Sequence, residues 1–190
     1  LLMNTEKGIN AGKYRSGIEP MQVISGSFGN FTVHYEAPPS KDLPNLMKAF
    51  FNWYQNFSKI EVGKIGEAML FSALTHLYFE TLHPFEDGNG RIGRALAEKA
   101  LAEKLELPIF ISLSKAIEKN KAQYYTELKK AQRDLQISDW ISYFFNILSE
   151  SIKDTKSVVL FTLKKTMFFE KFKNNLNERQ HKVINKMMEQ

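Results

Sequence analysis

The sequence contains no cysteine. Disulfide bonds, cysteine-based zinc sites and thiolate catalysis are therefore all excluded. Such a composition permits a reducing compartment, and we expect a cytoplasmic protein. The longest apolar stretches, 68–71 and 158–161, are far shorter than the roughly 20 residues of a membrane-spanning helix. We therefore expect no membrane partner.

Glycine and proline are scarce, with 10 and 6 among 190 residues, so the chain is not of low complexity. A length of 190 residues and a hydrophobic fraction of 43% suit one domain with its own core. Lys and Arg outnumber Asp and Glu by 26 to 21, which suits a phosphorylated or acidic partner without naming one. The first residue is not methionine and the last ones lie within a helical pattern, so we expect a piece of a longer protein.

Residues 21–37 carry a β pattern. Apolar and polar residues alternate on both sides of a Gly- and Asn-rich connection, which predicts a β-hairpin. Two strands alone are marginally stable, so the hairpin must pack on something larger. Helical spacing follows, with an amphipathic segment from Leu43, a segment over 65–82 that is apolar on most sides, and a final helix capped by Asn177. The predicted fold class is mainly α: a helical bundle with one β-hairpin.

The connector after the apolar segment concentrates functional groups. Its sequence over 83–94 is HPFEDGNGRIGR, with one histidine, two carboxylates, three glycines and two arginines. The glycine spacing matches a dinucleotide-binding fingerprint, but that motif directly follows a strand, whereas a helix precedes this one. A phosphate-binding loop ending in Gly-Lys-Ser/Thr is absent. Neither of these two kinds of nucleotide site is favoured.

The chemistry of the connector suits a diphosphate. Residues 88–90 precede a helix, where free N–H groups and the helix dipole favour anions. Arg91 and Arg94 lie on one side of its first turn, and guanidinium groups bind phosphate oxygens in pairs. Asp87 can hold Mg²⁺ together with such phosphates. His83 precedes a proline, which predicts an extended backbone, and can accept a proton from a hydroxyl.

Each residue also has a structural interpretation when taken alone. His83 could cap the C-terminus of the preceding helix, and Asp87 the N-terminus of the next. Arg91 and Arg94 could form surface ion pairs. Their contiguity favours the functional interpretation, whereas His76 in the apolar segment is expected to be a core histidine.

These twelve residues resemble the full signature of the Fic family, His-x-Phe-x-Asp/Glu-Gly-Asn-Gly-Arg-x-x-Arg. The resemblance is to Fic proteins with an N-terminal helical region and a C-terminal winged-helix segment. It implies a Fic-type helical bundle in which the hairpin, about 21–37, is a flap that aligns the target by strand addition. It also implies a catalytic domain over 1–175, with the motif loop at 83–94, and the start of a truncated helical or winged-helix segment over 176–190.

The resemblance further implies a protein adenylyltransferase. Such an enzyme moves AMP from Mg-ATP to a Ser, Thr or Tyr hydroxyl of a target protein, with self-modification as a further option. It assigns His83 as the general base and Asp87 as the ligand of the Mg²⁺ cofactor. The nucleotide-binding residues that it implies are Gly88, Asn89, Gly90, Arg91, Ile92, Gly93, Arg94, Tyr124 and Gln132.

Several alternatives stay open. The same site could transfer another phosphate-containing group or remove AMP from a target. The chain could instead be a nucleotide-sensing regulator that contacts DNA through its truncated C-terminal segment. The family often dimerises, so a homodimer is possible. The inhibitory Ser/Thr-x-x-x-Glu-Gly/Asn helix of related proteins is not found, since Ile9 follows Thr5 at the glutamate position.

Overall fold

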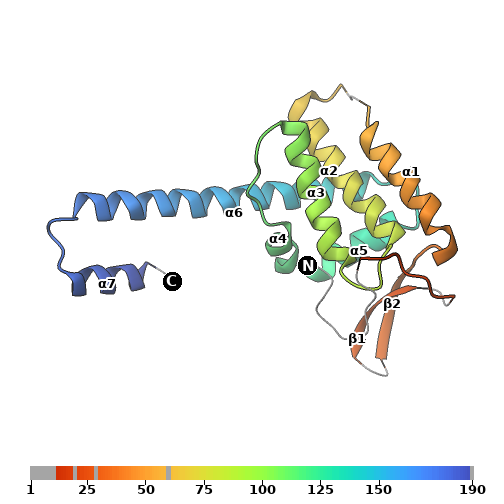
Figure 1. Cartoon of the computed structure of the whole chain (residues 1–190), viewed down its shortest axis with the longest axis horizontal. Helices are drawn as coiled ribbons and strands as arrows, with labels where there is room; N and C mark the ends of the chain where they lie inside the picture. Colours follow the sequence, from red (N-terminus) through yellow and green to blue (C-terminus); the bar gives the residue numbers. More distant parts are fainter. Residues whose placement is uncertain (1–11, 19–20, 28–29, 59–60, 189–190) are drawn as a thin grey trace. The chain divides into compact units, whose positions relative to one another are not determined.

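The structure is a computed structural model (Figure 1). It describes residues 12–18, 21–27, 30–58 and 61–188. The helices and strands, in chain order, are β1 (Gln22–Ser27), β2 (Asn30–Glu36), the 3-10 helix η1 (Ser40–Asp42), α1 (Leu43–Gln55), α2 (Gly63–Leu82), α3 (Asn89–Leu105), α4 (Leu113–Lys119), α5 (Lys121–Ala131), α6 (Ser138–Lys171) and α7 (Glu178–Met187). The predicted fold class, mainly α with one hairpin, is confirmed.

Contacts divide the chain into two compact units, Leu1–Ser151 and Ile152–Gln190. The first unit holds all elements up to the first turns of α6, and the second holds the rest of α6 together with α7. The division into a catalytic domain over 1–175 and a further segment over 176–190 stays a prediction.

The two strands form an antiparallel hairpin, as predicted. Gln22 lies opposite Glu36 at its open end, and the register shifts between Val23 and Ile24. Residues 28–29 of the predicted connection lie outside the described residues. The Tyr35 hydroxyl donates a hydrogen bond to the carbonyl of Thr81 in α2 over 3.1 Å. The hairpin is thereby attached to the last turn of α2.

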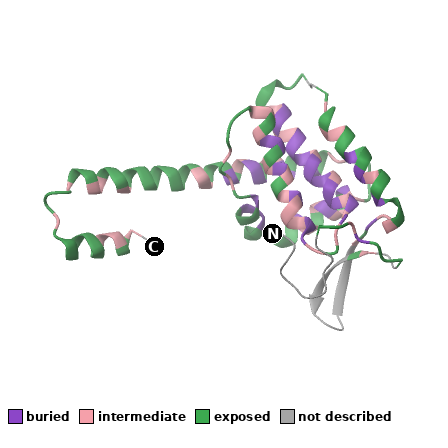
Figure 2. Ribbon diagram, viewed as in Figure 1, coloured by how far each residue is buried: buried purple, intermediate pink, exposed green. Residues whose placement is uncertain are grey.

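Helix α2 is the centre of the first unit, as its apolar sequence predicts. Both α1 and α3 pack against it, and Figure 2 shows buried residues along most of its length. A cluster around Phe50 and Phe79 fills the space between α1 and α2. A second cluster joins α2 to α5 and α6, and there the indole N–H of Trp140 donates to the carbonyl of Ala73 over 3.0 Å. His76 is fully buried and stacks on Trp140, so the prediction of a core histidine is confirmed.

The second unit contains the last predicted helix, with Asn177 as its N-cap. The side chain of Asn177 accepts from the backbone of Gln180 and the side chain of Gln180 accepts from the backbone of Asn177, which is a capping box at the start of α7. The rings of Phe169 and His181 lie 4.2 Å apart and join α6 to α7. None of the described helices combines the length and the hydropathy that crossing a bilayer requires.

Replacing Phe144 with alanine should lower the free energy of unfolding by about 3–5 kcal/mol, because this ring is fully buried against Trp140. The same change at Phe161, half exposed further along α6, should alter it by no more than about 0.5 kcal/mol. Urea unfolding followed by tryptophan fluorescence gives both values. Equal effects of the two substitutions would show that the start of α6 is not part of the core.

Candidate active site

The connector after α2 borders a cavity of about 320 Å³. Its walls come from the end of α2, the connector, the start of α3, and the helices α4 and α5. The predicted site residues that line it are His83, residues 87–91, Arg94 and Tyr124. The structure thus gathers the predicted base, the predicted metal ligand and both arginines around one space.

Three predicted nucleotide-binding residues do not line this cavity. Ile92 packs on the cluster around Phe50, and Gly93 is buried against α2. Gln132 lines a separate cavity of about 20 Å³, which His83 borders as well. Nucleotide binding by these three residues stays a prediction.

The cavity wall also includes side chains that the sequence reasoning did not assign to the site. Ser114 and Glu118 come from α4, and Lys121 and Tyr125 come from α5. The hydroxyl of Ser114 accepts a hydrogen bond of 2.8 Å from Nε of Arg94. The sequence offered little signal for this group, because its members lie outside the motif in two short helices.

The N-terminus of α3 has the features of an anion-binding site. Gly88 is its N-cap with a φ of 82°, a left-handed conformation that favours glycine, and no side chain caps the free N–H groups. The first turn contains no acidic residue. Free N–H groups and the positive end of the helix dipole therefore lie beside the cavity, where they can bind phosphate oxygens.

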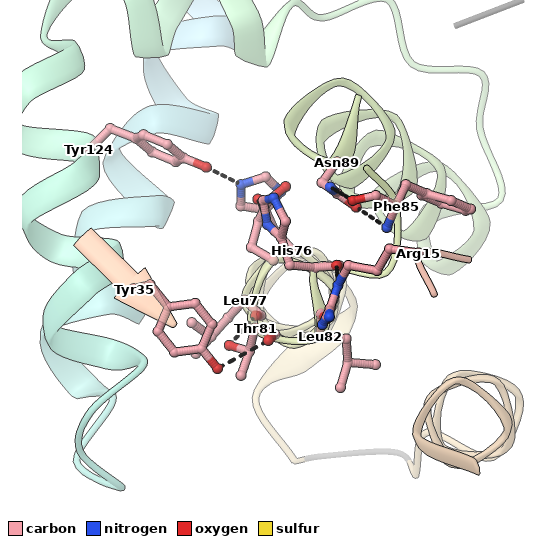
Figure 3. Close-up of polar contacts among 11 residues, drawn as sticks. Arg15, Tyr35, His76, Leu77, Thr81, Leu82, Phe85, Asn89 and Tyr124 are labelled. Atoms are coloured by element: carbon pink, nitrogen blue, oxygen red, sulfur yellow. Dashed lines mark hydrogen bonds and ion pairs between the residues drawn. The ribbon is translucent and has the colours of Figure 1, made fainter. Parts of the chain in front are cut away.

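The side chain of Asn89 forms two hydrogen bonds to the main chain of the connector (Figure 3). Its Oδ1 accepts from the backbone N–H of Phe85 over 2.9 Å, and its Nδ2 donates to the carbonyl of the same residue over 2.8 Å. Asn89 is only 2% exposed. This residue therefore fixes the shape of the loop, and its predicted contact with the nucleotide stays a prediction.

Asp87 and the two arginines lie at the cavity with different partners. Asp87 pairs with Arg91 over 2.6 Å, and both side chains are partly exposed. Because Gly88 is the N-cap and no side chain caps α3, the structural interpretation of Asp87 as a helix cap is excluded. Arg94 reaches Ser114 instead of an acidic residue. Two guanidinium groups are thus directed at one cavity.

The predicted extended backbone of His83 is wrong. With φ 45° and ψ 58° this residue is left-handed, and its N–H donates to the carbonyl of Phe79 as the C-cap of α2. A following proline disfavours the right-handed helical region, which leaves the left-handed region open besides the extended one. A left-handed residue other than glycine costs about 1–2 kcal/mol, so neighbouring contacts must hold it. His83 therefore caps the helix and lines the cavity at once.

Arg15 supplies those contacts, and sequence reasoning did not single it out. Its side chain is 5% exposed. Its Nε donates to the carbonyl of His83 over 2.8 Å, and its own backbone N–H donates to the carbonyl of Pro84 over 2.9 Å. The same guanidinium also donates to the carbonyl of Pro38 and to the hydroxyl of Ser40 (Figure 3 shows its position beside Leu82). It joins the end of α2 to the segment after β2.

The imidazole of His83 is largely enclosed, and its surroundings favour the neutral form. Its side chain is 13% exposed. Burial lowers the pKa of His83 to about 4, and the positive charge of Arg15 lowers it further, while the main chain of Glu80 opposes the shift. At neutral pH the ring is therefore free to accept a proton, as a general base must be.

A layer of buried polar side chains lies under the motif. Nε2 of His76 and the hydroxyl of Tyr124 are hydrogen-bonded at 2.9 Å (Figure 3). Burial lowers the pKa of His76 to about 4 and raises that of Tyr124 well above its usual value, so both stay neutral. Gly93 of α3 lies directly over this layer, where a Cβ would collide with the carboxyl oxygen Oε1 of Glu80.

Asp87, the predicted magnesium ligand, suits a metal ion that is bound partly by the phosphates of the substrate. Within the described ranges of the chain, no group of three or more His, Asp or Glu side chains is arranged to hold a metal ion. Mg²⁺ is commonly bound by one or two carboxylates together with substrate phosphates. Asp87 can supply such a carboxylate at the cavity, since its side chain is 44% exposed.

A sequence profile described as the Fic/DOC family matches residues 1–101, more than half of the chain. The chain belongs to the Fic/DOC family. A probable protein adenylyltransferase of Aquifex aeolicus is 33% identical over 102 residues, which are 54% of this chain and 28% of that protein. The protein adenylyltransferase Fic of Nematostella vectensis is 30% identical over 123 residues, or 65% of this chain and 24% of that one. This Fic/DOC chain thus spans about a quarter of the length of these relatives.

Solved structures agree on the fold. A Fic family protein from Desulfovibrio desulfuricans superposes with a TM-score of 0.61 at 26% identity, covering 77% of this Fic/DOC chain and 41% of that protein. A Fic domain containing signaling protein from Bacteroides thetaiotaomicron gives a TM-score of 0.51 at 24% identity, covering 77% and 53% respectively. The second likeness concerns the fold alone.

Replacing Gly93 with alanine should destabilise this Fic/DOC protein by about 1–3 kcal/mol, because the new methyl group overlaps the buried Glu80 carboxyl. Gly66 of α2 is the matched control. An added Cβ there meets only the Val62 side chain at 3.4 Å, so alanine should stabilise the helix by up to about 1 kcal/mol. Thermal unfolding measures both changes, and a Gly93→Ala protein as stable as the parent would contradict this packing.

Proposed function

We propose that this Fic/DOC protein transfers AMP from Mg-ATP to a Ser, Thr or Tyr hydroxyl of a target protein. One observation carries the proposal: a largely enclosed His83, whose pKa is lowered, shares a cavity with the N-terminus of α3 and with two arginines. The names of the relatives, protein adenylyltransferases, support the same reaction.

The chain's own groups suit each part of this reaction. His83 accepts the proton of the target hydroxyl, whose oxygen then forms a bond to the α-phosphorus of ATP. The bond from that phosphorus to the oxygen bridging to the β-phosphate breaks, and diphosphate leaves with that oxygen. Arg91, Arg94 and the free N–H groups of α3 bind the negative charge of the leaving group. Magnesium held by Asp87 and the phosphates would supply further charge neutralisation.

In this proposal the hairpin presents the target. Tyr35 is attached to Thr81, two residues before His83, so the open end of the hairpin, where β1 begins and β2 ends, lies near the proposed base. An extended target segment could add to the edge of this two-stranded sheet through main-chain hydrogen bonds. Such pairing would bring a target hydroxyl to the cavity without a specific side-chain code.

The alternative functions and partners that the sequence suggests stay predictions. Removal of AMP, or transfer of another phosphate-containing group, would use the same cavity, and the names of the relatives favour adenylyl transfer over both. A homodimer, contact with DNA through the C-terminal segment and a cytoplasmic location stay predictions.

His83→Ala should lower AMP transfer by about 10²–10⁴-fold, the share that a general base contributes, while ATP binding and folding stay intact. The assay incubates the chain with α-labelled ATP, Mg²⁺ and cell lysate, and self-modification is scored separately. His181→Ala in α7 is the control and should transfer AMP at the parent rate. Undiminished labelling by His83→Ala would refute the proposed base.

Arg94→Ala should raise the KM for ATP at least tenfold, because a charge-assisted contact to phosphate is worth roughly 1.5–3 kcal/mol. Steady-state kinetics with varied ATP measure this change. Arg133→Ala, an exposed arginine after α5, serves as the control for loss of one positive charge. Unchanged kinetics for Arg94→Ala would return this residue to a structural role with Ser114.

A further inference from the structure

Glu80 is a buried carboxylate that the proposed reaction has not used. It lies in α2 one turn before His83 and is 5% exposed. Its Oε2 is 3.9 Å from Nδ1 of His83. Its Oε1 has no hydrogen-bond partner, and neither does Nδ1 of His83 among the described residues. Oε2 is thus the carboxyl oxygen that lies towards the unpartnered Nδ1 of His83, whereas the unpartnered Oε1 lies against Gly93 and near His76.

We propose that Glu80 is a positioning residue that holds the His83 imidazole as its Nδ1–H tautomer, with Nε2 free for the target hydroxyl. This inference rests on the proposed function, because it assigns Glu80 through the base that it orients. Glu80 itself does not touch the substrate.

A buried Nδ1 needs an acceptor, and both the main chain and the carboxyl of Glu80 lie near enough to this ring to interact with it. A neutral imidazole carries its proton on one nitrogen, and the hydrogen bond made by that nitrogen sets which one. A base that accepts at Nε2 must be protonated at Nδ1, and a buried N–H without an acceptor costs about 1–3 kcal/mol. A movement of about 1 Å brings Oε2 within hydrogen-bond distance, and catalytic hydrogen bonds commonly tighten when substrate binds.

The packing of α3 holds the Glu80 carboxyl in this place. Gly93 lies so close to Oε1 that no side chain larger than hydrogen fits there. Glu80 and His83 together also border the cavity of about 20 Å³ under the hairpin. The carboxyl is thus confined between α2 and α3, with Oε2 on the side of His83.

The charges around the pair make its effect dependent on pH. Burial raises the pKa of Glu80 to about 7, and the positive charge of Arg94 opposes this shift. Ionised Glu80 stabilises the imidazolium that forms when His83 takes the proton, so kcat should rise as pH increases through about 7. The other titratable groups that face the pair are Arg15, Tyr35, His76, Tyr124, Tyr125 and Lys129.

Two substitutions separate positioning from packing. Glu80→Met removes the acceptor and keeps the volume, so kcat should fall at least tenfold with the KM for ATP unchanged. Glu80→Gln keeps an acceptor oxygen that cannot ionise, so it should recover part of the rate and lose the rise in kcat near pH 7. Glu67→Met, the same change at a carboxylate of α2 that pairs with Lys104 away from the cavity, should keep the parent kcat.

Nitrogen-15 NMR of histidine-labelled protein reads the tautomer without any turnover. We expect the Nδ1–H form of His83 in the parent, in Glu80→Gln and in Glu67→Met, and a mixture of tautomers in Glu80→Met. Thermal unfolding confirms that each variant is folded. If Glu80→Met keeps the parent tautomer, or the parent pH profile and kcat, the inference is wrong. If the parent protein transfers no AMP, the proposed function fails, and the NMR comparison still decides the role of Glu80.

Discussion

The geometry of the site depends on how α2 ends. A left-handed His83 followed by proline turns the chain sharply out of the helix, and this conformation is unfavourable for a residue with a side chain. The buried guanidinium of Arg15 compensates by binding the carbonyl of His83, a group that the helix leaves without a partner. The position of the proposed base therefore depends on Arg15, which contacts the main chain of His83 and does not line the cavity.

Buried polar groups help to hold the start of α3, in addition to the apolar residues that this helix contributes to both core clusters. His76, Tyr124 and Glu80 fill the space between α2, α3 and α5, and all three are uncharged or only partly charged near neutral pH. The hydrogen bond between His76 and Tyr124 specifies one arrangement more strictly than apolar packing does, whereas Oε1 of Glu80 has no partner among the described residues. A site that must direct several groups at one phosphate chain benefits from this strictness.

Periodicity and motif spacing predicted most of the fold and the main wall of the cavity. The central helix, the hairpin and the grouping of His83 with the two arginines follow from local patterns. Arg15 could not be found in this way, because its side-chain partners lie 23 to 68 residues away and nothing in its own segment marks it. The sequence predicts the wrong backbone for His83, because the extended preference of a residue before proline is only a local tendency and the C-cap of α2 takes the left-handed conformation instead. Ser114 and Lys121 reach the cavity through tertiary packing alone.

The ring of hydrogen bonds between Asn89 and Phe85 has a thermodynamic consequence. A glycine-containing loop would ordinarily lose much conformational entropy when it wraps around a ligand. Here the amide side chain ties the loop to its own main chain, so that loss has already occurred during folding. Association with a triphosphate then orders few additional bonds, and the favourable electrostatic energy of the complex is retained as affinity.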